Sequence, residues 1–412
     1  MVKVCDAIMG SGKSESAIRY MNDHPYKKFV YITPYPDEAK RIADNCPALS
    51  FKEPSNKIPY YNFSKLEHTR HLLRAGENIA TTHSAFRAYT NDMVDSIIAH
   101  QYTLIVDEAV DVLHDAQCSD SDVQLLLDGG YIKRDNGVYV YTGKAYEHGK
   151  LKEIFDMLKC NNLVRVESPT NGKNTHYYYW MLPQNIIQAF ADTIILTYMF
   201  ECSEFKYFLD LNGIVFDYIY VQKKEDGYSF TDHYVYTPEY VPFIRERVTI
   251  FENDKLNSIG KNRHALSANW MGNHAGEKDV LKRNIYTYLR YHQNAKQDGI
   301  MWATYKKDIP SLRGRGFTKS HVEFNKKASN DYRDRDTLAY CVNLFPSPQK
   351  VLFFAQYGIT YDADGYALST MVQWIWRSAI RDGKNINIYI PSNRMRQLLI
   401  DWLDSLEDKE AE

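Results

Sequence analysis

The sequence predicts an α/β protein with two parallel-sheet domains in tandem. Three observations lead to this fold class. An apolar stretch at 2–8 runs into a glycine-containing loop at 9–14, and a helical pattern follows at 15–21. Further short apolar runs alternate with amphipathic stretches, which is the order of elements that builds a parallel sheet. A chain of 412 residues is also too long for one hydrophobic core, so two domains are expected.

The elements of the first half follow in a regular order. We predict strands at 28–32, 78–82, 102–106 and 193–197 and helices at 36–45, 64–73 and 92–99. Ser64 is the expected N-cap of the helix that Gly76 ends. Residues 130–180 differ, because turn pairs such as Asn136-Gly137 separate short runs of aromatic residues. This stretch predicts a small α+β insertion in the first domain.

The second half repeats the alternation with other residues. Candidate strands lie at 214–221, 299–303, 321–324 and 386–390, and candidate helices at 279–292 and 367–381. We therefore divide the chain into a first domain at 1–205 and a second at 206–412. The charged residues 405–412 are expected to fray.

The composition limits the classes of protein that fit. Hydrophobic residues make up 44% and charged residues 25%, as in globular proteins, and the formal net charge is −2. This charge argues against a surface coated in positive charge but leaves room for a local basic groove. The six cysteines form no CxxC pair, which favours free thiols in a reducing compartment. No apolar run approaches the ~20 residues that span a bilayer, so we expect a cytoplasmic protein, in the host cytoplasm if viral, without a membrane partner.

The loop Met9-Gly10-Ser11-Gly12-Lys13-Ser14 has the residue types that bind the phosphates of a nucleotide. Its glycines let the backbone turn several N–H groups into one concavity, and the following helix adds positive potential there. Lys13 can reach the terminal phosphates, and the Ser14 hydroxyl can hold Mg²⁺. The alternative is an ordinary glycine turn before a helix.

An acidic pair, Asp107-Glu108, ends the predicted strand at 102–106. Behind a phosphate-binding loop, such an aspartate holds Mg²⁺ and such a glutamate polarises the attacking water. The alternative is a solvated acidic turn. The strand before the pair and Ala109 after it favour the hydrolytic interpretation.

Gln373, Arg377 and Arg381 are spaced four residues apart, so a helix over 367–381 would present all three on one face. An arginine near the γ-phosphate stabilises the charge that develops during phosphoryl transfer. The alternative is a solvated basic face that forms salt bridges. The neighbouring Trp374 and Trp376 would then form the core face of the same helix.

Together, these three stretches resemble motifs I, II and VI of superfamily 2 helicases of the DEAD/DEAH kind. The resemblance implies two RecA-like P-loop domains with ATP and Mg²⁺ between them. Trp376 occupies the position where the family usually has glycine. This departure and the Met-Gly-Ser-Gly-Lys form of the loop are most similar to phage-encoded replicative helicases and to the herpesvirus origin-binding helicase group.

Other stretches resemble the remaining helicase motifs more loosely. Thr33-Pro34 is placed like motif Ia, residues 81–84 like the next DNA-contacting turn, 301–306 like motif IV and 325–330 like motif V. Residues 196–200 are similar to motif III, with Tyr198 and Met199 as departures. The resemblance implies nucleic-acid contacts from Thr33, Pro34, Thr82, His83, Thr304, Lys306, Lys307, Lys326 and Asn330.

Residues 303–335 form a basic stretch in a chain that is slightly acidic overall. They hold nine Lys or Arg and four Asp or Glu, a local excess of five positive charges. Tyr305, Phe317 and Tyr332 lie among them, and positive charge with interleaved rings is typical of a single-strand groove. The alternative is an ordinary lysine-rich surface.

These patterns predict a DNA-stimulated ATPase, a superfamily 2 helicase or translocase of replication or recombination. Lys13 and the loop bind ATP, Ser14 and Asp107 hold Mg²⁺, and Glu108 activates water, while Gln373, Arg377 and Arg381 act from the second domain. The expected partners are single-stranded or forked DNA, with RNA left open, and replication proteins, and the expected state is a monomer. Two alternatives stay open, a terminase-like DNA-packaging ATPase and a nucleotide-switched DNA binding or annealing protein.

Overall fold

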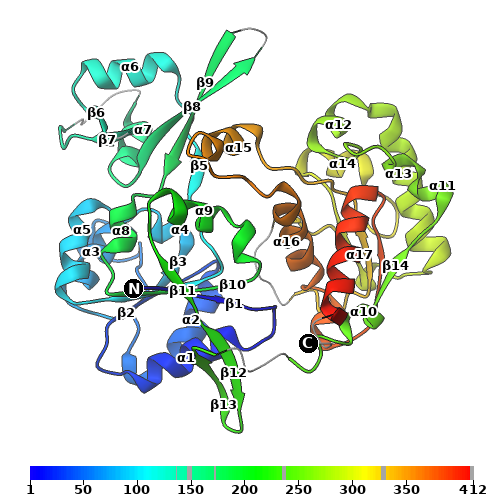
Figure 1. The fold of residues 1–412 in the computed structure, drawn as a ribbon, viewed down its shortest axis with the longest axis horizontal. Helices are drawn as coiled ribbons and strands as arrows, with labels where there is room; N and C mark the ends of the chain where they lie inside the picture. Colours follow the sequence, from blue (N-terminus) through cyan, green and yellow to red (C-terminus); the bar gives the residue numbers. More distant parts are fainter. Residues whose placement is uncertain (136, 146–150, 171–172, 234–237, 326–330, 409–412) are drawn as a thin grey trace. The chain divides into compact units, whose positions relative to one another are not determined.

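The structure is a computed structural model that describes residues 1–135, 137–145, 151–170, 173–233, 238–325 and 331–408. Its contacts divide the chain into two compact units. Unit 1 comprises Met1–Tyr236 and Ser347–Tyr361, and unit 2 comprises Thr237–Pro346 and Asp362–Glu412. Each unit contains its own parallel sheet (Figure 1). The predicted fold class, two RecA-like parallel-sheet domains in tandem with an α+β insertion in the first, is confirmed.

Unit 1 is built on a six-stranded parallel sheet with the order β11-β1-β10-β4-β2-β3. The sheet buries both faces, and all five residues of β2 are buried. As a result of the strand order, β10 lies between the strand before the glycine loop and the strand that ends at Asp107. The strands are β1 (Val2–Asp6), β2 (Phe29–Thr33), β3 (Ile79–Thr82), β4 (Thr103–Asp107), β10 (Asp192–Thr197) and β11 (Phe216–Tyr218).

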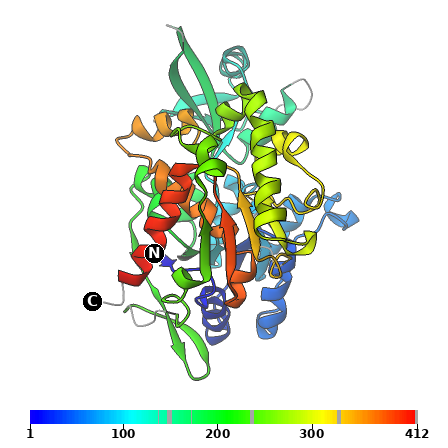
Figure 2. The same ribbon diagram turned by 90° about the vertical axis from the view of Figure 1, so that its right-hand side faces the viewer.

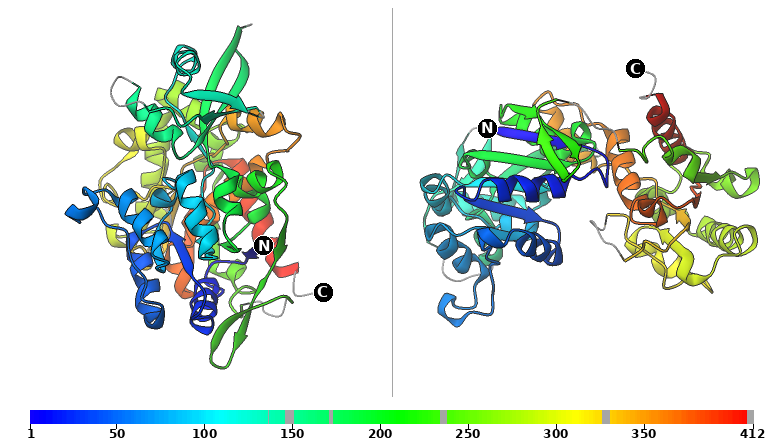
Figure 3. Two further views of the ribbon diagram at one scale, coloured as in Figure 1. Left: turned by 90° about the vertical axis from the view of Figure 1, so that its left-hand side faces the viewer. Right: turned by 90° about the horizontal axis from the view of Figure 1, so that it is seen from below.

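Helices connect these strands and cover the sheet, as Figure 3 shows from two further sides. The predicted helix at 36–45 is α2 to the residue, with proline in its first turn. Ser64 caps α3 by accepting a hydrogen bond from the Glu67 amide, as predicted. The helices are α1 (Lys13–Asp23), α2 (Pro36–Asn45), α3 (Lys65–Arg74), α4 (His83–Phe86), α5 (Asn91–Ala99), α8 (Gln184–Gln188) and α9 (Glu204–Leu211).

The insertion is an antiparallel sheet with the order β5-β9-β8-β7-β6, packed against two helices. It begins earlier than 130, because β5 (Leu113–Asp115) and α6 (Asp120–Asp128) belong to it. Its long hairpin of β8 and β9 extends away from the parallel sheet of unit 1 (Figure 2). The other elements are β6 (Ile132–Asp135), β7 (Val138–Tyr141), α7 (Lys152–Leu158), β8 (Asn162–Thr170) and β9 (Lys173–Met181).

Two further segments join unit 1 from later in the chain. An antiparallel hairpin, β12 (Tyr220–Lys224) and β13 (Gly227–Thr231), packs against α1. Together with β11, it brings residues 206–236 into unit 1, although the predicted division of the chain lies at 205. Helix α15 (Pro348–Ala355) packs on β8, and Lys350 forms a 2.8 Å ion pair with the largely buried Glu204.

Unit 2 is built on a four-stranded parallel sheet with the order β14-β17-β16-β15. The predicted strand at 321–324 is wrong. Only His321 forms a bridge, because Trp302 pairs its backbone with Ser320 and Val322 and the chain then turns away. The elements are α10 (Ile244–Arg247), β14 (Val248–Phe251), α11 (Asp254–Asn257), α12 (Ala268–Asn273), α13 (Ala275–Thr287), β15 (Ile300–Ala303), α14 (Ile309–Leu312), β16 (Thr337–Tyr340), α16 (Ala363–Ile375), β17 (Ile386–Tyr389) and α17 (Asn393–Asp408).

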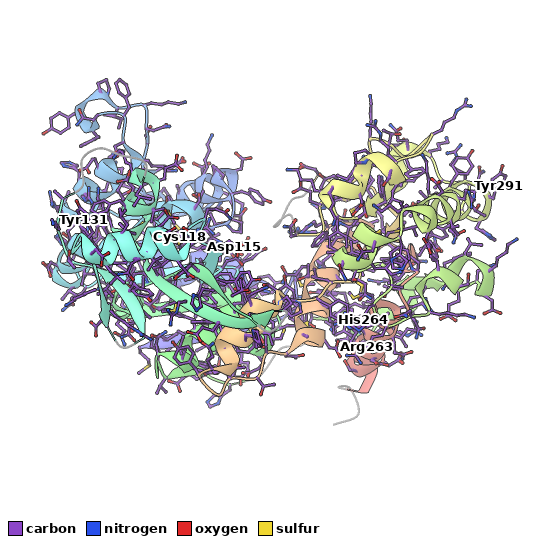
Figure 4. The ribbon with its side chains drawn as sticks, turned by 90° about the horizontal axis from the view of Figure 1, so that it is seen from above. Asp115, Cys118, Tyr131, Arg263, His264 and Tyr291 are labelled. Atoms are coloured by element: carbon purple, nitrogen blue, oxygen red, sulfur yellow. The ribbon has the colours of Figure 1, made fainter. Side chains whose placement is uncertain are left out.

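The six cysteines are free thiols in this structure. The partly exposed Cys118 lies in the insertion, which also carries Asp115 and Tyr131 (Figure 4). Burial raises the pKa of the Cys118 thiol to about 12, so it stays protonated near neutral pH. None of the helices in the described ranges combines the length and the apolar character that crossing a bilayer requires.

Candidate nucleotide-binding and hydrolysis site

The glycine loop connects the end of β1 to the start of α1. Gly10 and Gly12 have φ angles of 82° and 91°, in the left-handed region that favours glycine. Helix α1 begins at Lys13, and its N-cap Gly12 offers no side-chain cap. The first-turn N–H groups therefore have no intrahelical acceptor and none from the side chain of the N-cap residue, which suits an anion. Met9 and Ser14 are partly exposed and Gly10 is exposed, so much of the loop is open to a ligand.

The Lys13 ammonium is held over the loop by backbone carbonyls. Its Nζ donates to the oxygens of Ala7 and Ile8, at 3.0 Å for Ile8. Removal from water lowers the pKa of Lys13, and nearby Cys5 and Asp107 oppose that shift. An ammonium that is costly to desolvate gains from an anionic partner, so phosphate oxygens are suitable replacements for the two carbonyls.

Asp6, directly before the loop, fixes the turn that follows β10. Its two carboxylate oxygens accept hydrogen bonds from the amides of Met199 and Phe200, both at 2.8 Å. Met199 has a φ of 59°, which is left-handed and therefore needs such support. Burial raises the pKa of Asp6, and the two amide bonds oppose the shift. Backbone bonds to Asp6 thus hold the stretch that resembles motif III.

Asp107 ends β4 in a largely enclosed position. The Tyr31 hydroxyl donates a 2.9 Å hydrogen bond to its Oδ2. Burial, followed by the charges of Glu108 and Glu38, raises the pKa of the Asp107 carboxyl to about 7. The negative charge of this carboxylate is unfavourable in its buried position, so a cation that binds it is stabilising. This property is expected of a Mg²⁺ ligand.

The backbone around Asp107 is fixed on two sides. The ring Nε2–H of His83 donates to the Asp107 carbonyl at 2.8 Å. Glu108 has a φ of 62°, and its amide donates to the Leu196 carbonyl at 2.9 Å. Left-handed backbone at a non-glycine residue persists only where its surroundings enforce it, and it often marks a functional position. Here it sets the direction in which the Glu108 side chain leaves the sheet.

Strand register places these features at one edge of the parallel sheet. Asp6 pairs with Thr197, and Leu196 pairs with Asp107, so the ends of β1, β10 and β4 are level. In such sheets, ligands bind outside the carboxyl ends of the strands. The structure therefore brings the loop and the acidic pair together, although they lie far apart in the sequence.

The residues present fit a nucleotide and a divalent cation. Within the described residues, the buried Ser11 hydroxyl has no hydrogen-bond partner, and the start of α1 is uncapped. Ser14 and Asp107 supply the oxygen ligands that Mg²⁺ prefers. Bound there, the cation would neutralise charge on the phosphates.

The predicted nucleic-acid residues of unit 1 lie on adjacent strands. Thr33 and Thr82 are partners in the register of β2 and β3, and Pro34 is partly exposed beside them. Both threonines are buried, and the Thr82 oxygen accepts from the Ala85 amide at 3.4 Å to cap α4. His83 is turned inward to Asp107. In this structure these side chains support the sheet edge, and only Pro34 is open to a ligand.

The expectation of one helix face carrying Gln373, Arg377 and Arg381 is wrong. Helix α16 ends at Ile375, because the Ser378 hydroxyl bonds the Ile375 carbonyl at 2.6 Å and Ser378 is extended. Arg377 is buried and donates to the Glu323 carbonyl at 3.1 Å, whereas Arg381 is exposed in a separate 3₁₀ turn. Trp374 and Trp376 are buried, as predicted for core residues.

The basic stretch of unit 2 is only partly open. Thr304 is buried and its hydroxyl has no partner among the described residues, whereas Lys306 and Lys307 are exposed. Phe317 is fully buried edge-on against Trp302, so its predicted role as a stacking ring is wrong. The remaining described cations with exposed side chains are Arg313, Arg315, Lys319 and Arg333, the last of which forms an ion pair with Asp382. Lys326 and Asn330 lie outside the described residues.

Comparison with known proteins places the chain in a family. It is 35% identical over 413 residues to the SPbeta prophage-derived uncharacterized protein YonV of Bacillus subtilis (strain 168), covering 98% of this chain and 99% of the relative. Residues 243–403 match the family model described as the YonV C-terminal Rossmann-like domain. The chain belongs to the YonV family.

Two solved structures also align with this YonV-family chain. Xpd4 of S. tokodaii has a TM-score of 0.49 at 11% identity, covering 97% of this chain and 94% of that one. A structure named XPD helicase has a TM-score of 0.45 at the same identity and coverage.

Four residues of this candidate site escape sequence reasoning, namely Asp6, Tyr31, His83 in its actual role, and Tyr228 of β13, whose ring lies against Gly12. Asp6 carries a usable signal, because a charged residue at the end of an apolar strand needs a partner. The others act through strand register or through a distant hairpin, which no local pattern shows.

The surroundings of His114, in β5, are expected to make the stability of this chain sensitive to acid. Two neighbours compete for His114 Nε2. The Arg87 guanidinium, 2.9 Å away, can donate only to an unprotonated nitrogen, whereas the Asp111 carbonyl, 3.1 Å away, can accept only from a protonated one. Burial and then Arg87 lower the pKa of His114 to about 4. The unfolded chain takes up a proton near pH 6.5, so this part of the stability is present above pH 6.5 and is lost as the pH falls toward 4.

Wild type should lose unfolding free energy between pH 6.5 and pH 4. We expect this loss to be smaller by about 1 kcal/mol in His114→Gln, a value that is reduced because His114 is partly exposed. Urea unfolding at several pH values measures this change. The exposed His233→Gln is the matched control. A pH profile for His114→Gln that is parallel to wild type would contradict the assignment.

Proposed function

We propose that this YonV-family chain is an ATP-dependent helicase or translocase of the superfamily 2 kind. One observation carries the proposal. The glycine loop with Lys13 and the acidic pair Asp107-Glu108 lie at the same edge of one parallel sheet, with a single strand between them. A phosphate cradle beside a cation-binding carboxylate and a second carboxylate is an arrangement for hydrolysis of a nucleoside triphosphate.

Each residue of unit 1 has a separate role in this proposal. Lys13 and the first amides of α1 hold the phosphates, and Ser14 and Asp107 hold Mg²⁺. Glu108 orients and polarises the attacking water. Tyr31 and His83 keep Asp107 in position by bonding its carboxylate and its carbonyl.

Unit 2 supplies the groups that make hydrolysis depend on movement. Gln373, Arg377 and Arg381 are the proposed contributors, with Arg381 the exposed one. Arg377 would first have to leave the Glu323 carbonyl that it now bonds. An arginine that reaches the phosphates only in one state ties turnover to a conformational change.

Nucleic acid is the polymer along which we propose that the protein moves. Of the residues predicted above, Pro34, Lys306 and Lys307 are the described ones with side chains open to such contacts. Phosphate contacts from such side chains give binding without sequence preference and with strong salt dependence. Single-stranded or forked DNA, a role in replication or recombination with replication proteins, and a monomer in the host cytoplasm complete the proposal.

The test is the rate of ATP hydrolysis with single-stranded DNA, duplex DNA, forked DNA and RNA side by side. We expect DNA-stimulated turnover that falls at least about 100-fold in Lys13→Ala and in Glu108→Gln. ATP binding should be lost in the first variant and kept in the second. Lys40→Ala, which changes an exposed lysine of α2, is the control.

Turnover that survives either substitution would overturn the proposal. Nucleotide-dependent DNA binding without turnover would instead identify a switch protein. DNA cleavage in the presence of Mn²⁺ would favour a packaging ATPase with its own nuclease.

A further inference from the structure

The hairpin of β12 and β13 is fastened along helix α1. Arg19 of α1 forms a two-pronged ion pair with Asp226 at the hairpin turn, with distances of 2.7 and 2.8 Å. Tyr20 packs its ring 6.2 Å from that of Phe230. These contacts at both ends of β13 fix the position of the residues between them relative to the helix that follows the glycine loop.

One of those residues, Tyr228, lies directly on the loop. A Cβ atom added to Gly12 would stand 2.4 Å from ring carbons Cγ and Cδ1 of Tyr228, and its three nearest neighbours would all belong to this ring. The aromatic ring therefore covers the backbone one residue before Lys13. Tyr228 itself is only partly buried, although it also packs against the hydrophobic core of unit 1.

We infer that Tyr228 is the platform on which the base of the bound nucleotide stacks. This inference rests on the proposed function, because it assumes that the loop holds the phosphates. A nucleoside attached to those phosphates has to leave the loop across its rim, where Tyr228 stands. Aromatic rings bind bases through their faces, in a way that tolerates different bases but favours the large purines.

The contacts that hold the hairpin in place suit this role. A stacking platform has to keep a fixed distance from the phosphate cradle, and the packing of Tyr228 against the hydrophobic core of unit 1 contributes to its position. The ion pair of Arg19 with Asp226 and the ring contact of Tyr20 with Phe230 also hold the hairpin to α1. The hairpin thus supplies base recognition, and the loop supplies phosphate recognition.

The experiment compares Mg-ATP with Mg-tripolyphosphate, which has the phosphates but no base. Calorimetry measures both dissociation constants for the full-length wild type and for Tyr228→Ala, Tyr228→Phe and the control Tyr60→Ala, which removes an exposed tyrosine. We expect Tyr228→Ala to weaken ATP binding at least tenfold while tripolyphosphate binding changes less than twofold. Tyr228→Phe should restore ATP binding, because its ring is retained.

The outcomes separate this inference from the proposed function. Wild type that binds neither compound would overturn the proposed function itself. Equal losses for both compounds in Tyr228→Ala would show that the ring only shapes the loop, and tighter binding of both would show that it obstructs the loop. Either result would overturn the stacking role while leaving the phosphate site in place.

Discussion

Replacement of Asp107 with asparagine is expected to stabilise the metal-free protein at pH 8 while it reduces ATP turnover at least a thousandfold. Both effects have one cause. Burial and the charges of Glu108 and Glu38 raise the pKa of Asp107 to about 7, so the ionised carboxylate is unfavourable in the folded chain. The same carboxylate is the proposed ligand of Mg²⁺, and asparagine is a much weaker one.

The sign of the stability change follows from linkage. Because the folded pKa lies above the unfolded value of 3.8, the contribution of Asp107 is fully present below pH 4 and is lost as the pH rises through 7. Asp107→Asn removes that loss, and its amide oxygen can still accept the hydrogen bond from Tyr31. We expect a gain of about 1–3 kcal/mol in unfolding free energy at pH 8 and none at pH 4.

Urea unfolding in EDTA at the two pH values measures this gain, and an ATPase assay with Mg²⁺ measures the loss of turnover. Asp44→Asn, which changes an exposed aspartate of α2, should alter neither quantity. If Asp107→Asn shows the same pH dependence of stability as wild type, the pKa of the Asp107 carboxyl is not raised in the folded chain. If it retains turnover, Asp107 is not a metal ligand.

Features set by a few consecutive residues could be predicted from the sequence. The strand, glycine loop and helix at the start of the chain follow from apolar patterning and from glycines that only a left-handed turn explains. Helix α2 follows from proline at its start and acidic residues in its first turn. In both cases the signal and the structure occupy the same short stretch.

Features that depend on distant partners could not be predicted. Strand β11 pairs with β1, the hairpin of β12 and β13 packs on α1, and helix α15 returns to Glu204 and β8, so their place is decided by contacts far along the chain. The prediction that Gln373 and Arg377 share one helix face is wrong for a more local reason. One hydroxyl, that of Ser378, ends α16 early, and periodicity carries no information about that bond.

A glycine in unit 2 gives the second large expected effect. Gly260 ends a 3₁₀ turn, and a Cβ atom added there would stand 1.8 Å from the Pro391 carbonyl oxygen and 2.4 Å from its carbon. These are backbone atoms directly after β17, which lies inside the parallel sheet of unit 2. Unlike a side chain, they cannot rotate away, so Gly260→Ala should destabilise unit 2 by about 3 kcal/mol or more.

The matched control is Gly276→Ala, in the first turn of α13, where an added Cβ meets nothing within 4 Å. That change should be neutral or stabilising by up to about 1 kcal/mol. Urea unfolding followed by circular dichroism measures both variants. A Gly260→Ala protein as stable as Gly276→Ala would contradict the packing of the turn against Pro391.

Gly260→Ala also tests the division of labour between the units. The phosphate loop and the acidic pair belong to unit 1, whereas the proposed arginines belong to unit 2. In urea that unfolds only the weakened unit, Mg-tripolyphosphate should still bind, because its site is complete in unit 1, but DNA-stimulated hydrolysis should disappear. Parallel loss of binding and hydrolysis would mean that unit 1 cannot hold the phosphate site alone. If hydrolysis persists, unit 2 contributes no residue that ATP hydrolysis requires.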